Sequence, residues 1–162
     1  MFRAPLFVLV LIAFISVSCG PTVDLTKGLK VSIVSSGWFD AGIVNGNQNK
    51  LVPEVTFTLT NTSDQKLPVL QVMASYRRVN ENEEWGNAFM SATGPEALAP
   101  GATTKPLTAK SQLGYTGSNQ SRQEMMQSSH FMDAKVQLFA KYGSIQWVKI
   151  GEYPIERTLI TK

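Results

Sequence analysis

The chain has very little of the chemistry on which most enzymes and metalloproteins depend. Its 162 residues include one cysteine, Cys19, and one histidine, His130. A lone cysteine forms no internal disulfide or redox pair, and one histidine without further thiolates excludes the usual zinc sites. The sequence holds no Gly-x-Ser-x-Gly elbow and no glycine-rich phosphate loop of Walker or Rossmann spacing. Stability must therefore come from packing, and no metal or cofactor is expected.

The chain also lacks a large excess of charge of either sign. Fifteen Lys and Arg residues face twelve Asp and Glu residues, which gives a net charge of +3. The basic residues are scattered, and Arg77-Arg78 is the only adjacent pair. Nucleic-acid binding is typically carried by a basic patch or stripe. Nucleic acid is therefore not an expected partner.

The first apolar run is too short to cross a bilayer. It extends from Leu6 to Ile15, whereas a transmembrane helix needs about 20 apolar residues. Arg3 precedes the run, and small residues follow it up to Cys19. A basic start, an apolar middle and small residues before a cut are the order of a secretory signal peptide. Residues 1–18 are therefore predicted to be a signal peptide.

The block Ile15-Ser16-Val17-Ser18-Cys19 resembles a bacterial lipobox, with Ser16 where Leu is usual. This resemblance to bacterial lipoproteins implies cleavage before Cys19, lipid on its sulfur and an acylated new N-terminus, so that a membrane is a partner of the protein. Gly20, and not Asp, follows Cys19. By resemblance to sorted lipoproteins of bacteria with two membranes, Gly20 favours the outer membrane over the inner one.

Two other interpretations of the N-terminus stay open. Ser16 and Ser18 also satisfy the small-residue rule for simple secretion, and the segment could instead form a buried strand. Simple secretion would leave one unpaired thiol on an exported protein, which is a liability in an oxidising compartment. Lipidation gives Cys19 a use and is the favoured prediction.

Removal of residues 1–18 leaves 144 residues, a length typical of one domain. Because Arg3 leaves with the signal peptide, 14 basic and 12 acidic residues remain, and the net charge falls to +2. Residues 19–28 contain Gly, Pro and several polar residues, which predicts a lipidated cysteine followed by a tether. The folded domain is predicted over residues 29–162.

Apolar residues in this domain recur with period two, the pattern of strands with one buried face. Turn signals separate the strands: Pro100-Gly101 fits a type II turn, Gly143-Ser144 a hairpin turn, and Gly151 a bulge. The alternating sets are Leu29, Val31 and Ile33; Val55, Phe57 and Leu59; Leu70, Val72, Ala74 and Tyr76; Val136, Leu138 and Ala140; and, less regularly, Tyr153, Ile155 and Leu159. A further strand is expected over residues 103–108, so an all-β antiparallel sandwich is predicted.

One segment departs from this pattern. Ser121 is followed three residues later by Glu124, the order of a helix capping box. A short helix is therefore predicted from Arg122 to Phe131, with Met125 and Met126 facing the sheet.

Two segments, residues 55–63 and residues 98–103, resemble parts of immunoglobulin-like and fibronectin-like modules. In such modules the first segment is an inner strand ending in a turn, and the second leads into a later strand. The resemblance implies an immunoglobulin-like β-sandwich. The Cys…Trp…Cys signature of antibody domains is absent.

Candidate chemistry in the domain is sparse. His130 lies beside Ser128 and Ser129, but neighbours in sequence do not make a catalytic triad, and a histidine also suits a helix end. Met125, Met126, His130 and Met132 carry thioether and imidazole groups that suit Cu(I), whereas Met is also a common core filler. Core packing is the preferred interpretation.

The carboxylates point to surface roles. Glu81, Glu83 and Glu84 lack the spacing of a calcium loop and predict a solvated turn. Glu152 and Glu156 share a strand face, which leaves glycoside hydrolysis open. A surface charge ladder with Lys149 or Arg157 is the preferred interpretation.

Aromatic residues near loop signals are the best candidates for partner binding. Trp38, Phe39, Trp85 and Tyr115 are predicted to contact a partner, since exposed aromatic rings are frequent hot spots. The alternative is that Trp38, Phe39 and Trp85 close an end of the sandwich, which is the commoner role of such residues, and that Tyr115 forms a structural tyrosine corner. Trp147 is expected in the core.

Together these observations predict a lipid-anchored, non-enzymatic binding or assembly module, an accessory protein of a bacterial envelope complex with a protein partner. A carbohydrate or small-ligand binder is the first alternative, and an enzyme is the second. A groove with two parallel aromatic faces would favour sugar, and a flat apolar patch would favour protein.

Overall fold

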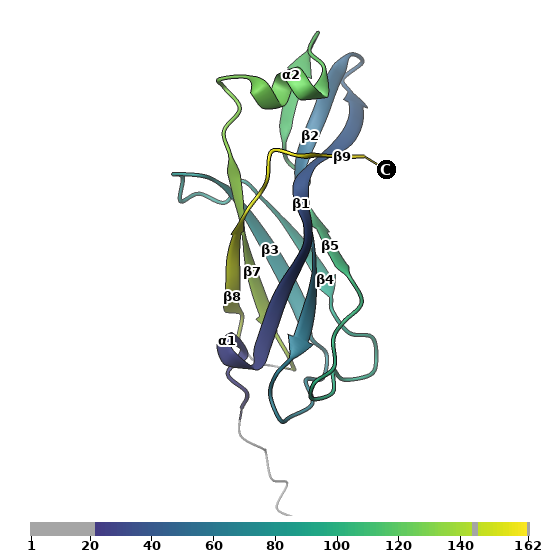
Figure 1. The fold of residues 1–162 in the computed structure, drawn as a ribbon, viewed down its shortest axis with the longest axis vertical. Coiled ribbons are helices and arrows are strands. Elements are labelled where there is room, and N and C mark those ends of the chain that lie inside the picture. Colours follow the sequence, from purple (N-terminus) through teal and green to yellow (C-terminus); the bar gives the residue numbers. More distant parts are fainter. Residues whose placement is uncertain (1–21, 144–145, 162) are drawn as a thin grey trace, which may run out of the picture.

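The computed structural model describes residues 22–143 and 146–161, which form two packed β-sheets (Figure 1). One sheet has the strand order β5-β2-β1-β9, with β6 also paired to β2; the other has the order β4-β3-β7-β8. The predicted all-β sandwich is confirmed. The strands are β1 (Leu29–Val44), β2 (Gln48–Asn61), β3 (Gln71–Arg78), β4 (Gly86–Ser91), β5 (Leu107–Lys110), β6 (Tyr115–Ser118), β7 (Ala134–Lys141), β8 (Val148–Pro154) and β9 (Leu159–Ile160).

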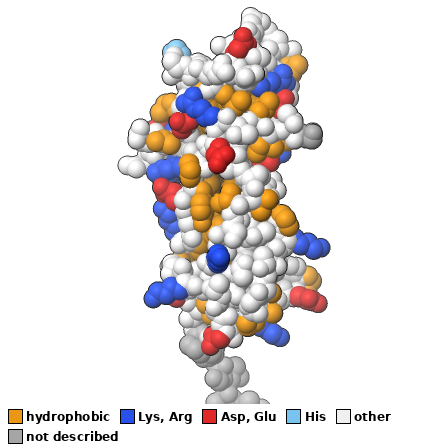
Figure 2. Space-filling view, in the orientation of Figure 1, with side chains coloured by type: hydrophobic (Ala, Val, Ile, Leu, Met, Phe, Trp, Pro, Cys, Tyr) orange, Lys and Arg blue, Asp and Glu red, His pale blue; other side chains and the backbone are white. Residues whose placement is uncertain are grey.

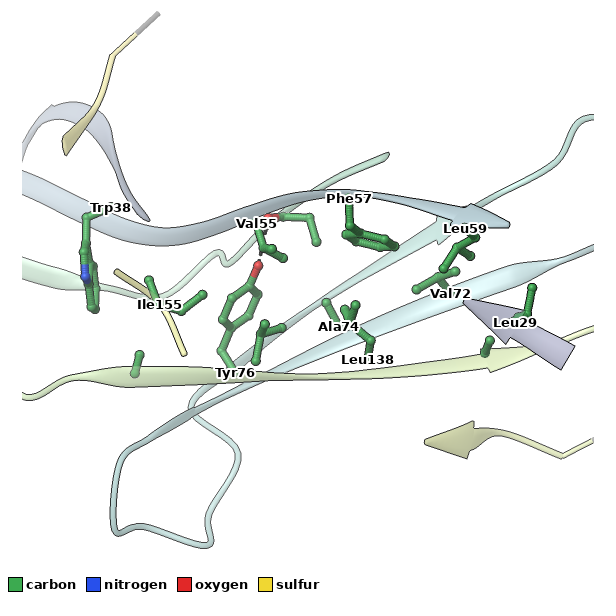
Figure 3. Close-up of a cluster of buried hydrophobic side chains, with 14 of the residues drawn as sticks. Leu29, Trp38, Val55, Phe57, Leu59, Val72, Ala74, Tyr76, Leu138 and Ile155 are labelled. Carbon is green, nitrogen blue, oxygen red and sulfur yellow. Dashed lines mark hydrogen bonds between the residues drawn. The ribbon is translucent and has the colours of Figure 1, made fainter. Parts of the chain in front are cut away.

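The core lies between the sheets, and the predicted alternation places it correctly. Side chains of β2 and β3 point toward one another across the sandwich (Figure 3). The apolar residues predicted on the inner faces of β2, β3 and β7 are fully buried: Val55, Phe57, Leu59, Val72, Ala74, Tyr76, Val136, Leu138 and Ala140. The hydroxyl of Tyr76 donates to the carbonyl oxygen of Ala109 at 2.8 Å. Burial raises the pKa of Tyr76 far above its usual range.

The long hairpin β1–β2 was only partly predicted. The alternation of Leu29, Val31 and Ile33 breaks because the pairing register shifts between Ile33 and Ser35. Val34 is extra at this bulge, and 60% of it is exposed. The hairpin turns at Asn45 and Gly46, which both have positive φ. This dipeptide is the strongest local hairpin signal, and its use would have extended the predicted first strand.

Two of the predicted turn features are confirmed. Gly101 has a φ of 74°, and the N–H of Ala102 donates to Ala99 across the turn, as a type II turn requires. Opposite β7 the register shifts between the Leu138–Gly151 pair and the Phe139–Lys149 pair, which is the expected bulge. The Ser144 side of the predicted hairpin turn lies outside the described residues.

Other elements differ from prediction. Neither β4 nor β6 was predicted as a strand. The strand expected at 103–108 begins at Leu107, while Thr103 makes only an isolated bridge to Thr60. β4 lies at a sheet edge and β6 has four residues, so neither shows a long alternating pattern.

The segment predicted as a tether belongs largely to the domain. Residues Leu25–Gly28 form the short helix α1, capped by the side chain of Asp24. Leu25 is buried in the core, and the N–H of Val23 donates to the hydroxyl of Tyr142 at 2.6 Å. The predicted tether over 19–28 is therefore too long, because the apolar side chains of Val23 and Leu25 pack into the fold.

The second helix, α2 (Arg122–Gln127), begins at the predicted capping box. The hydroxyl of Ser121 accepts from the N–H of Glu124, and the Glu124 carboxylate accepts from the N–H of Ser121. The hydrogen bond from the N–H of Ser121 to its carboxylate lowers the pKa of Glu124. Met125 and Met126 are buried, as predicted. The helix is shorter than the predicted 122–131, because Ser128 has extended backbone angles and ends it.

The predicted signal peptide and Cys19 lie outside the described residues. Within the described part of the chain, no helix combines the length and apolar character needed to span a membrane.

Candidate functional site

The two ends of the elongated sandwich are formed by different helices, strands and turns. The near pole is the end with α1, where the described chain begins. The distal pole is the opposite end, with α2, β9 and the β1–β2 turn (Figure 1). Three of the four aromatic residues predicted to bind a partner lie together at the distal pole, which makes that pole the candidate site.

The rings of Trp38, Trp85, Tyr115 and Phe131 form an aromatic cluster beneath the distal pole. Trp38 is central: its ring lies 4.5 Å from Phe131, 5.6 Å from Tyr115 and 6.1 Å from Trp85, between centroids. None of Trp38 is exposed. The prediction that Trp38 contacts a partner is therefore wrong for the folded domain. The other interpretation, that aromatic rings close the end of the sandwich, describes it.

The remaining predicted aromatics are also engaged within the domain. Phe39 is 9% exposed, and the Lys110 ammonium lies 3.1 Å from its ring centroid. Trp85 is half-buried under the guanidinium of Arg78. Tyr115 is half-buried, and its hydroxyl both accepts from and donates to the backbone of Met132. The prediction that Phe39 contacts a partner is thus also wrong, while the side chains of Trp85 and Tyr115 remain partly exposed.

Arg157 links the segments that cover the aromatic cluster, namely the end of α2 and the residues before β7. Its guanidinium donates to the carbonyl oxygens of Met126 (2.8 Å) and Phe131 (2.9 Å) and to the Asp133 carboxylate (2.6 Å). It also stacks at 5.3 Å over the Phe131 ring. Hydrogen bonds from a charged donor are stronger than neutral ones, so Arg157 ties the end of α2 to the segment before β7. Sequence reasoning placed Arg157 only in a surface charge ladder.

The last strand completes the pole. β9 pairs in parallel with β1 at Trp38 and Phe39, and the N–H of Trp38 donates to the carbonyl oxygen of Thr158 at 2.8 Å. Gly37 permits this approach, because a Cβ there would lie 2.5 Å from that oxygen. The side chain of Trp38 therefore packs against aromatic rings, and its backbone pairs with the C-terminal segment.

A cleft of about 550 Å³ opens between α2 and the segment that contains β9. It is lined by Gln123, Met126, Gln127, Arg157, Thr158 and Leu159. Amides, a guanidinium, a thioether and the 36%-exposed Leu159 are groups that bind mixed polar and apolar surfaces. No aromatic ring lines the cleft, and it contains no carboxylate or histidine.

A smaller cavity of about 110 Å³ joins Ser128 and His130, the pair considered for nucleophilic catalysis. The Ser128 hydroxyl accepts a hydrogen bond from the backbone N–H of His130 at 3.3 Å. Activation of the serine needs a hydrogen bond to the imidazole instead, and no carboxylate lines the cavity to orient that ring. The geometry thus gives this pair a turn-forming role.

The remaining candidates lie on the surface or in the core. Met125 and Met126 pack in the core while His130 is exposed, which is the arrangement expected of packing and not of a copper site. Within residues 22–143 and 146–161, no three His, Cys, Asp or Glu side chains gather to hold a metal ion. Glu152 bonds to Lys149 and Gln137, which lowers its pKa to about 2 and matches the predicted ladder.

Trp147 differs from prediction. It was expected in the core, but it is partly exposed and precedes β8. Its ring lies 6.2 Å from that of Phe89, which is 64% exposed on β4. The surface of the near pole therefore carries aromatic residues that sequence reasoning did not single out.

Comparison with models of known protein families finds no match to this chain, and comparison with curated proteins finds none either.

Proposed function

We propose that the protein is a lipid-anchored, extracytoplasmic binding module, held at the near pole through Cys19 and binding a protein partner at the distal pole. Its role is assembly, as an accessory protein of a bacterial envelope complex. The observation that carries this proposal is the placement of the 550 Å³ cleft at the end of the sandwich opposite the start of the described chain. The anchor rests on the lipobox-like block before Cys19.

The short connection supports this orientation. Val23 is fixed by its hydrogen bond to Tyr142, so only three residues separate Cys19 from a held position. A fully extended residue spans at most about 3.6 Å, so the four steps from Cys19 to Val23 cover roughly 14 Å. A lipid on Cys19 would keep the near pole close to the bilayer and leave the distal pole free to reach a partner.

The lining of the cleft favours a protein over a carbohydrate. Sugar binding by stacking needs presented aromatic faces, whereas the distal ring pairs are tilted or edge-on and buried beneath the pole. The cleft offers Gln123, Gln127 and Arg157 as hydrogen-bond donors beside Met126 and Leu159. Partner segments with mixed polar and apolar side chains match such a surface. Basic and acidic side chains are interspersed on the face seen in Figure 2 and form no basic stripe.

The anchor is tested by the mass and location of the protein in its native host. We expect cleavage before Cys19, added mass of acyl chains, and fractionation with membranes. The variant Cys19→Ser keeps the domain and should lose both the acyl mass and the membrane association. A mature protein that is soluble and carries no lipid would overturn the anchored part of the proposal.

The binding surface is tested by site-specific photocrosslinking in intact cells. A photoreactive residue at Gln127, on the cleft, should give a discrete adduct, while the same residue at exposed Lys105 on the sandwich body serves as control. The Gln127 adduct should disappear in Leu159→Asp, which places a charge in the cleft. Equal adducts at both positions, or an adduct indifferent to Leu159→Asp, would refute the distal surface.

A further inference from the structure

The near pole carries exposed apolar side chains on the outer face of the four-stranded sheet and in the turns beside it. We call the near-pole patch the set Val69, Phe89, Lys141 and Trp147. Val69 is 55% exposed and Phe89 is 64% exposed. The ammonium of Lys141 lies 4.9 Å from the centroid of the Trp147 ring, whose edge contact with Phe89 joins the set. Large apolar side chains gathered on a surface typically mark an interaction site.

The sheet continues this apolar surface between its strands. Met73 on β3 lies opposite Phe89 on β4 and opposite Phe139 on β7 in the pairing register. Met73 and Phe139 alternate with buried residues, and Phe89 lies between Ala88 and Met90, which are partly buried against the core, so all three share the outer face. The result is an apolar row that crosses three strands, with Lys149 of β8 next in register to Phe139.

The near-pole patch borders the place where the chain enters the domain. Lys141 directly precedes Tyr142, whose hydroxyl accepts the hydrogen bond from Val23. The N–H of Gly143 donates to the carbonyl oxygen of Pro68, which places Val69 beside the same turn. A lipid on Cys19 therefore enters the membrane within roughly 14 Å of Val23, next to these residues.

The turn at Val69 has an unusual backbone. Val69 has a φ of 50°, and a β-branched residue with positive φ is a genuine outlier. Such conformations cluster at functional sites, where the surrounding structure holds them. Here the strained turn holds an isopropyl group out into solvent instead of burying it.

We propose that the near-pole patch docks into the interfacial layer of the bilayer that holds the Cys19 lipid, so that the near-pole end of the four-stranded sheet meets the membrane and the distal pole stays away from it. This inference rests on the proposed lipid anchor. Trp and Phe favour the membrane interface, and Lys extends its ammonium to the headgroups while its stem stays apolar. A protein partner at the near-pole patch would have to fit the space beside the short connection, and the membrane fills that space directly.

The docking is tested on a chain that begins at Cys19, since every described element lies after residue 22. The only thiol, on Cys19, is coupled to maleimide lipid in vesicles of phosphatidylethanolamine and phosphatidylglycerol. Brominated acyl chains then quench tryptophans that reach the interface. We expect quenching of a component that Trp147→Ser removes, while buried Trp38 and distal Trp85 are unaffected.

A reversed attachment provides the control. In the variant Cys19→Ser with Asn47→Cys, the maleimide lipid is coupled at the exposed β1–β2 turn, at the distal pole. Quenching of Trp147 should be lost, because the near-pole patch then points away from the vesicle. Equal quenching in both orientations, or none in the Cys19-coupled protein, would overturn docking; a crosslink from Phe89 to an envelope protein would assign the near-pole patch to a protein instead.

Because the coupling is chemical, this result does not depend on cellular acylation. If the native protein lacks lipid but the coupled protein docks, the anchor fails while the chemistry of the near-pole patch holds. If the native protein is acylated but the coupled protein shows no quenching of Trp147, the anchor holds and the docking fails.

Discussion

The two poles treat their aromatic residues in opposite ways. At the distal pole, Trp38 is surrounded by rings and covered by α2 and the Arg157 contacts. At the near pole, Phe89 is 64% exposed and Trp147 is partly exposed, with the Lys141 ammonium over the indole. Both sets lie close to turns in the sequence. The difference shows that an aromatic residue near a loop is buried or exposed according to what distant segments bring over it.

The largest expected contrast between the poles is in stability. Trp38→Ala removes a fully buried ring and should lower the free energy of unfolding by about 3–5 kcal/mol, since truncating a buried aromatic leaves a cavity. Trp147→Ala should lower it by less than about 1 kcal/mol, because that ring is partly exposed. Urea denaturation followed by circular dichroism measures both.

A matched variant refines this contrast. The indole Nε1 of Trp38 has no hydrogen-bond partner among the described residues. Trp38→Phe should therefore cost less than Trp38→Ala, since only ring volume is lost and no hydrogen bond is broken. If Trp38→Ala and Trp147→Ala were equally mild, the distal cluster would not be the packed end described above.

Removal of the Arg157 contacts at the distal pole should have the next largest effect on stability. Arg157→Ala removes three hydrogen bonds from a charged donor and leaves the carbonyl oxygens of Met126 and Phe131 without it. We expect a loss of about 1–3 kcal/mol and faster amide exchange in α2 than in β7, measured by hydrogen–deuterium exchange. Lys149→Ala, which removes only surface pairing with Glu152, is the control. Equal exchange in α2 of both variants would show that Arg157 does not hold the cover.

The helix caps give the smallest expected contrast. Ser121→Ala breaks the capping box of α2 and should cost about 1 kcal/mol. Asp24→Ala should have a smaller effect, because α1 is a single turn held by its buried Leu25. Thermal unfolding of the two variants compares them directly. A larger loss for Asp24→Ala would mean that capping, and not packing, holds the near pole.

Much of the sandwich was predictable because its inner strands follow a local rule. Val55, Phe57 and Leu59 alternate with threonines, and this period fixes both the strand and its buried face. The capping box likewise fixed the start of α2. Its end was missed because Arg157, about thirty residues away, binds the carbonyl oxygens of Met126 and Phe131 on either side of Ser128.

The candidate site was less predictable, because its cover is assembled from distant segments. Trp38 carries no local sign that β9 pairs with its backbone or that Phe131 contacts its ring. The cleft lies between a helix and a two-residue strand, and β9 is too short for periodicity to reveal. The near-pole patch was missed for a similar reason. Because β4 was not predicted as a strand, Phe89 could not be assigned to the outer face of a sheet.

The pairing of β1 with β9 also sets an order of events. Among the described residues, β1 is the first strand and β9 is the last, so the segment that pairs with the Trp38 backbone emerges only after every other described strand. A chain that emerges from its N-terminus, whether from a ribosome or through a translocation channel, can pair β1 with β2 early but has to wait to close the distal pole. Burial of the aromatic cluster therefore depends on synthesis of the chain through β9. A domain truncated before Arg157 would expose the cluster, and the cluster becomes buried only when β9 has paired.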